Sequence, residues 1–126
     1  MNVPVATYRL QFRPGFGFAQ AQALLPYLQR LGISHIYASP VARARAGSTH
    51  GYDVCDPREI APELGGRAGY LELLHAVRAA GMGWLQDIVP NHLAASVESP
   101  FWYDLLIWGR RSRWAWLYDI DWEHAG

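Results

Sequence analysis

The stretch GWLQDIVPNH, residues 83–92, decides the fold of this chain. It begins as a short apolar run, interrupted by Gln86, and then reaches Asp87 and a β-branched pair. This pattern is typical of a buried parallel strand with polar groups at its carboxyl end. Pro90 cannot donate a backbone hydrogen bond, so the strand should end there, and Asn91 and His92 follow where α/β folds place functional side chains. The stretch therefore predicts a strand leading into a site; the alternative is a buried strand whose Asp87 and Asn91 merely cap a loop.

Two earlier strands and a helix precede this stretch. Residues 6–12 alternate between apolar and polar side chains, and residues 33–39 form a second short strand closed by Pro40. Between them, apolar residues recur every three or four positions from Phe18 to Leu31, which predicts an amphipathic helix ending at Gly32. A kink or a late helix start would accommodate Pro26. Strand, helix and strand in this order predict a βαβ unit.

A long segment, residues 41–69, shows neither helical nor strand periodicity and is expected to form a loop. Loops of this length are usually functional or disordered. Tyr52 and Val54 alternate with acidic residues, which favours order. A second helix is expected from Tyr70 to Ala80. The chain thus predicts three parallel strands joined by two crossover helices, followed by a Trp- and Tyr-rich segment at residues 101–122.

Composition narrows the class of protein. The length of 126 residues suits one domain, and 51% hydrophobic with 17% charged residues indicates a globular chain. Eleven basic and eleven acidic residues cancel, so nothing favours binding to nucleic acid or to a membrane surface. The single cysteine, Cys55, excludes an internal disulfide, and no signal peptide or long apolar run is evident, so a cytoplasmic location is expected. Six Trp and seven Tyr suit either interfaces or sugar faces.

Four motifs carry a resemblance to the α-amylase family of (β/α)8 barrels. They are TYRLQF (7–12), LGISHIY (31–37), ARAGSTHGYDV (44–54) and DIDW (119–122), in the order and at the spacing of that family. Within the family, the chain is similar to the (1→4)-α-D-glucan 1-α-D-glucosylmutases. The resemblance covers essentially the whole chain. It implies an α/β fold formed by the first three β/α units of an incomplete TIM-type barrel, with residues 1–126 as the N-terminal part of a catalytic domain.

The resemblance also implies a maltooligosaccharide or α-glucan substrate and the residues that bind it. Tyr52 would line the subsite of the glucosyl unit at the cleaved bond, because its face can stack on a pyranose. His92 would hydrogen-bond the 6-hydroxyl of the same unit. Asp87 would lie beneath the site and brace the basic residue beside the nucleophile, with Asn91 packed beside His92. A core tyrosine and a loop histidine bonded to the backbone are the alternative interpretations.

Other residues of the same motifs have smaller implied roles. Asp53 would hold its loop in place through backbone hydrogen bonds, and His50 and Arg45 are candidates for subsite contacts. Asn91 is a calcium ligand in some relatives, but one amide lacks the oxygen cluster that calcium requires, so no metal is expected. No cofactor is implied.

The resemblance supplies no catalytic residue. Retaining glycoside chemistry needs two carboxylates about 5 Å apart, and in this family they arise from the fourth, fifth and seventh strands. A closed barrel takes about 200 residues or more. We therefore expect the N-terminal part of an enzyme that converts a reducing-end α-1,4 linkage into an α,α-1,1 linkage by intramolecular transglycosylation. The 126 residues alone are expected to be inactive and to self-associate through an open sheet edge.

Two other classes of protein remain open. A maltooligosaccharide-binding module without catalysis would also display Trp and Tyr, although such modules are usually β structures and the pattern here is βαβ. A small nucleotide-binding domain is the second alternative. No Gly-x-Gly-x-x-Gly follows the first strand and no Walker sequence is present, which disfavours it.

Overall fold

The fold centres on a parallel three-stranded sheet. The computed structural model describes residues 3–124. The strands lie in the order β1 (Thr7–Leu10), β2 (His35–Ala38) and β5 (Gly83–Gln86), and both neighbouring pairs are parallel. Because the strands are parallel, their carboxyl ends meet at one edge of the sheet. The predicted three parallel strands with two crossover helices are confirmed.

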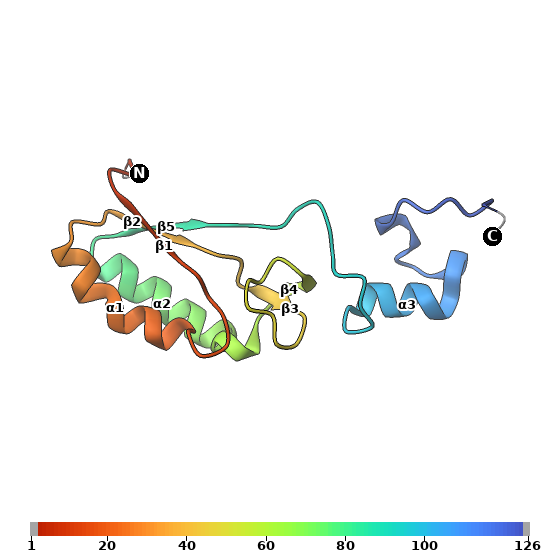
Figure 1. Ribbon diagram of the computed structural model, residues 1–126, viewed down its shortest axis with the longest axis horizontal. Coiled ribbons are helices and arrows are strands. Elements are labelled where there is room, and N and C mark those ends of the chain that lie inside the picture. Colours follow the sequence, from red (N-terminus) through yellow and green to blue (C-terminus); the bar gives the residue numbers. More distant parts are fainter. Residues whose placement is uncertain (1–2, 125–126) are drawn as a thin grey trace.

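Helices α1 (Phe18–Arg30) and α2 (Gly66–Ala79) pack side by side against one face of this sheet (Figure 1). Apolar side chains from that face and from the two helices form the core. Its fully buried members include Phe12, Phe18, Ala21, Leu28, Ile36, Ala38 and Leu73. Four aromatic rings, those of Phe12, Phe18, Tyr70 and Trp84, form a chain of contacts with centroids 5.3–6.1 Å apart.

The expectation of a late helix start at Pro26 is wrong. α1 begins at Phe18 and runs through Pro26, which lies on its exposed side. A proline leaves one helical carbonyl without its hydrogen bond. On the exposed side of α1 this carbonyl can bond to water, so the proline destabilises the helix less than it would in the core.

The segment expected to be an irregular loop contains regular structure. β3 (Ala42–Ala44) and β4 (Val54–Ile60) form an antiparallel hairpin, a short 3-10 helix follows at Pro62–Leu64, and α2 begins at Gly66. The register of the hairpin shifts twice within three residue pairs. Such irregular pairing leaves no regular period in the sequence, which explains why the hairpin was missed.

The strand at the start of the 83–92 stretch is shorter and more exposed than expected. β5 ends at Gln86 instead of reaching Pro90, although the Asp87 N–H still donates to the Ala38 carbonyl at 2.9 Å. None of its residues is fully buried, because β5 pairs only with β2 in the described sheet. Gly83 permits the close pairing, since a Cβ there would lie 2.2 Å from the His35 ring.

The Trp- and Tyr-rich segment lies beyond the hairpin, at the end of the molecule away from α1 and α2 (Figure 1). It contains α3 (Pro100–Trp108) and two 3-10 turns, Gly109–Arg111 and Ala115–Leu117. Ser99 caps α3 by accepting a hydrogen bond from the Trp102 N–H at 3.4 Å. Among residues 3–124, no helix has the length and apolar character that crossing a membrane requires.

Candidate functional site

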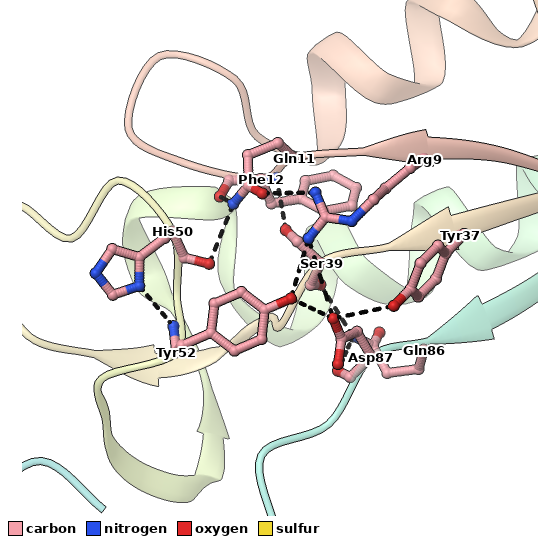
Figure 2. Close-up of polar contacts among 9 residues, drawn as sticks. All are labelled: Arg9, Gln11, Phe12, Tyr37, Ser39, His50, Tyr52, Gln86 and Asp87. Atoms are coloured by element: carbon pink, nitrogen blue, oxygen red, sulfur yellow. Dashed lines mark hydrogen bonds and ion pairs between the residues drawn. The ribbon is translucent and has the colours of Figure 1, made fainter.

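A hydrogen-bonded cluster lies at the carboxyl ends of the parallel strands (Figure 2). Asp87, the first residue after β5, is its centre. One carboxylate oxygen, Oδ2, accepts the hydroxyl of Tyr52 in a short hydrogen bond and the hydroxyl of Tyr37 at 3.3 Å. Tyr37 comes from β2 and Tyr52 from the segment before β4, so three parts of the chain meet at this oxygen.

Arg9 of β1 completes the cluster with a positive charge. Its Nη2 donates to the Tyr52 hydroxyl at 3.0 Å and lies 4.0 Å from Asp87 Oδ2, while its Nη1 donates to Gln11 at 2.7 Å. The guanidinium also lies over the Tyr37 ring, 5.5 Å from its centroid. The Asp87 side chain is 17% exposed and that of Arg9 38%, so the pair is partly shielded from water.

The register of the sheet explains this convergence. Arg9 is paired with Tyr37, and Tyr37 in turn with Leu85, two residues before Asp87. Successive side chains of a strand alternate between faces. Arg9, Tyr37 and Asp87 therefore project from the face opposite to the helices. The sequence motifs did not single out Arg9 or Tyr37 as site residues, because pairing across strands is not visible in a local window.

The contacts of Tyr52 shift its acid–base equilibrium. The hydrogen bond to Asp87 raises the pKa of Tyr52, burial adds to this effect, and Arg9 opposes it. The hydrogen bond with Tyr52 raises the pKa of Arg9. At neutral pH the cluster thus contains a neutral tyrosine that donates to a carboxylate and accepts from a cation, which fixes its ring.

The loop carrying Tyr52 is tied to β1. The Gln11 side chain donates to the His50 carbonyl at 3.1 Å, and His50 Nδ1 accepts the Tyr52 N–H at 3.0 Å. The His50 and Tyr52 rings stack with centroids 6.1 Å apart. Gly51 adopts a φ of +78°, and a Cβ there would lie 2.8 Å from the Pro40 carbonyl oxygen, so the tight turn requires glycine. The His50 side chain therefore helps to hold Tyr52 in position.

His92 and Asn91 lie next to the cluster. His92 Nε2 contacts the Tyr52 carbonyl at 3.0 Å, and its Nδ1 contacts Asn91 Oδ1 at 2.9 Å. Both side chains are exposed. The structure therefore brings Asp87, Asn91, His92 and Tyr52 together, as expected for one site wall. Both ring nitrogens of His92 already contact protein oxygens, those of Asn91 and of the Tyr52 carbonyl.

Asp53 and Arg45 stabilise the loop rather than enter the cluster. The Asp53 carboxylate accepts the Ser48 hydroxyl at 2.5 Å, and its backbone carbonyl accepts the Arg45 N–H at 3.1 Å. Asp53 thus holds the loop through its side chain as well as through the expected backbone bond. The Arg45 side chain pairs with Glu98 at 3.9 Å, away from Asp87. Within residues 3–124, no three His, Cys, Asp or Glu side chains gather in a way that could hold a metal ion.

Comparison with known proteins identifies the family. The model of the α-amylase catalytic domain matches residues 21–107, so the chain belongs to the α-amylase family. Its relatives within that family include a putative maltooligosyl trehalose synthase of Mycobacterium tuberculosis, 48% identical over 94% of this chain and 16% of the relative. Maltooligosyltrehalose synthase from Arthrobacter ramosus superposes with a TM-score of 0.92 at 43% identity, over 95% of this chain and 16% of that one.

A more distant relative supports the same family. An intracellular maltogenic amylase of Bacillus subtilis is 34% identical over 79% of this chain and 16% of the relative. The chain spans about a sixth of the length of these proteins. The resemblance to the glucosylmutase branch of the α-amylase family is confirmed, and a nucleotide-binding domain is left without support.

Proposed function

We propose that this chain forms the first three β/α units of a (β/α)8 barrel and supplies one wall of an α-glucan site. The enzyme containing that barrel would convert the reducing-end α-1,4 linkage of maltooligosaccharides into an α,α-1,1 linkage. The observation that carries the proposal is the cluster of Arg9, Tyr52 and Asp87 at the carboxyl ends of the strands, where barrels of this type bind substrates. The names of the relatives support the substrate class.

In this proposal, Tyr52 presents its ring to the apolar face of a glucosyl unit. Because Asp87 and Arg9 fix its hydroxyl, the ring needs little reordering when sugar binds. His92 would exchange its contact with the Tyr52 carbonyl for a sugar hydroxyl, which an imidazole can either accept from or donate to. The loop at residues 41–69 would hold Tyr52 in place, and the segment at 101–122 would flank the site.

The cluster supports binding rather than bond cleavage. Retention at an anomeric carbon requires a nucleophilic carboxylate and an acid/base about 5 Å apart. Asp87 is the one carboxylate in the cluster with Arg9, Tyr37 and Tyr52. The two tyrosine hydroxyls donate to it, and the Arg9 charge lies 4.0 Å away, so it is stabilised as an ionised acceptor. We therefore propose that the 126-residue chain binds maltooligosaccharides without turnover, which is also the behaviour of the alternative, a binding module.

Calorimetric titration of the purified chain with maltopentaose tests this proposal. We expect the wild type to bind and Tyr52→Ala to weaken binding about tenfold, because the stacking surface is lost. Tyr27→Ala is the matched control, since Tyr27 is exposed on α1, remote from the strand ends. The same samples should yield no trehalosyl product.

The absence of maltopentaose binding in a folded wild-type chain would refute the proposed function. Equal affinity of the wild type and Tyr52→Ala would refute the site. Product above a blank without protein would show that the chain carries catalytic groups of its own.

A further inference from the structure

Two adjoining hollows lead away from Asp87 towards the C-terminal segment. The first, of about 160 Å³, is lined by Asp87, Val41 and Val54 among others. The second, of about 540 Å³, lies between Asn91–Leu93 on one side and Leu117–Asp119 on the other. Both are lined by Pro57, Val89 and Pro90, so they border each other along the same short stretch of chain. The larger hollow has the size of a typical ligand pocket.

The far wall of the second hollow is held firmly. The Tyr118 ring packs edge-on against Trp102 with centroids 5.3 Å apart, and its hydroxyl is buried without a hydrogen-bond partner among residues 3–124. Burial raises the pKa of Tyr118 above its ordinary value. Tyr118 and the neighbouring Asp119 both line this cleft.

The carboxylate of Asp119 is available to a ligand. Two other acids of the segment are engaged within the protein: Asp104 accepts the Ser112 hydroxyl, and Asp121 accepts the Glu123 N–H at 3.0 Å. Asp119 is exposed, and its carboxylate has no hydrogen-bond partner among residues 3–124. The other lining side chains of this cleft are mostly apolar.

This combination suits a carbohydrate. A glucosyl unit presents C–H groups on its faces and hydroxyl groups around its rim. Apolar walls can cover the faces, and a carboxylate with two oxygens can accept hydrogen bonds from two neighbouring hydroxyls. His92 lines the cleft and also contacts Tyr52, so a glucan bound at Tyr52 would have a continuous path into it.

We infer that the cleft between Asn91–Leu93 and Leu117–Asp119 binds further glucosyl units of an α-1,4-glucan whose end is held at Tyr52. Asp119 is the residue that accepts their hydroxyl hydrogen bonds. The inference rests on the proposed function, and it makes Asp119 a determinant of chain-length preference. Maltose would fill the Tyr52 region, whereas maltopentaose would also occupy the cleft.

The test compares maltose with maltopentaose on wild type, Asp119→Asn and Asp121→Asn. We expect Asp119→Asn to weaken maltopentaose binding about tenfold, as for the loss of charge-assisted hydrogen bonds, and to leave maltose binding unchanged. Asp121→Asn is the matched control, because it lies two residues away and its carboxylate already has a backbone partner. In the wild type, amide NMR signals of residues 91–93 and 117–119 should shift with maltopentaose and not with maltose.

The outcomes separate this inference from the proposed function. Wild-type binding of maltopentaose that Asp119→Asn leaves unchanged would overturn the inference alone. Absence of shifts at residues 117–119 would overturn it even if the Asp119 variant fails to fold. If neither sugar binds the folded wild type, both the proposed function and the inference are refuted.

Discussion

The Tyr52 hydroxyl is the point at which the charges of the candidate site meet. It donates to Asp87 and accepts from Arg9, so it is balanced between a carboxylate that favours its neutral form and a cation that favours its ionised form. The carboxylate has the larger effect, and the pKa of Tyr52 is raised. Neutralising Asp87 should therefore lower the pKa of Tyr52, and neutralising Arg9 should raise it.

We expect Tyr52 to ionise above the usual tyrosine value of about 10. Asp87→Asn should lower its pKa and Arg9→Gln should raise it, as measured by NMR titration of tyrosine labelled with ¹³C at Cζ. Because the pKa is higher in the folded chain than in the unfolded chain, the hydrogen bond contributes stability below about pH 10 and loses it as the pH rises through the folded value. Identical titration curves in the wild type and Asp87→Asn would contradict the hydrogen bond to Asp87.

At this scale, the sequence predicted the site residues that lie in local motifs better than their partners on neighbouring strands. Asp87, Asn91, His92 and Tyr52 lie in recognisable motifs, and their proximity could be predicted from the rule that strand ends converge. Arg9 could not, because its contact with Asp87 depends on the register of β1, β2 and β5, which is set by the packing of the whole sheet.

At the scale of the elements, an ion pair and two cation–π contacts connect the β3–β4 hairpin to the C-terminal segment. Asp56 of β4 is 2% exposed, and its carboxylate accepts from Arg58 Nε at 2.9 Å and Nη2 at 2.7 Å. The Arg58 guanidinium then lies over the Phe101 ring at 4.6 Å and over the Trp114 ring at 6.0 Å. This bidentate pair holds the pKa of Asp56 below its usual range.

Arg58→Gln should loosen residues 99–118 from the hairpin while the sheet and helices remain folded. Near-UV circular dichroism from Trp114 should weaken, and proteolysis should become faster in that segment. Arg43→Gln is the control: Arg43 pairs with Glu59 at 3.1 Å on the exposed side of the same hairpin, and exposed pairs contribute about 1 kcal/mol or less. Equal protease sensitivity of both variants would show that Arg58 does not hold the segment.

The hairpin also shows why some elements escape sequence analysis. β4 contains Pro57, and its burial does not alternate: three buried residues are followed by three exposed ones and the half-buried Ile60. A proline is tolerated because β4 pairs only with β3 in the described sheet. The helices were predictable because each has one buried face and hence a period in its sequence.

At the scale of the whole molecule, the described residues 3–124 place helices on one face of the sheet only. α1 and α2 bury one face, whereas Arg9, Tyr37 and Leu85 line the other, where Tyr37 is 36% exposed and Leu85 38%. Among residues 3–124, β1 and β5 each have one neighbouring strand, which leaves one row of backbone groups on each without a partner strand. Ile88, just beyond β5, is 67% exposed.

We expect this chain, expressed by itself, to self-associate, because pairing of free edges and burial of the uncovered face are both satisfied by a second copy. Sedimentation velocity over a micromolar concentration series should show a weight-average mass that rises with concentration. Leu85→Lys with Ile88→Lys should lower that mass, since charge on an edge strand opposes pairing. Leu71→Lys, on the exposed side of α2, should leave it unchanged. A monodisperse monomer with a cooperative melt at every concentration would show that the C-terminal segment or the charged cluster already protects the edge.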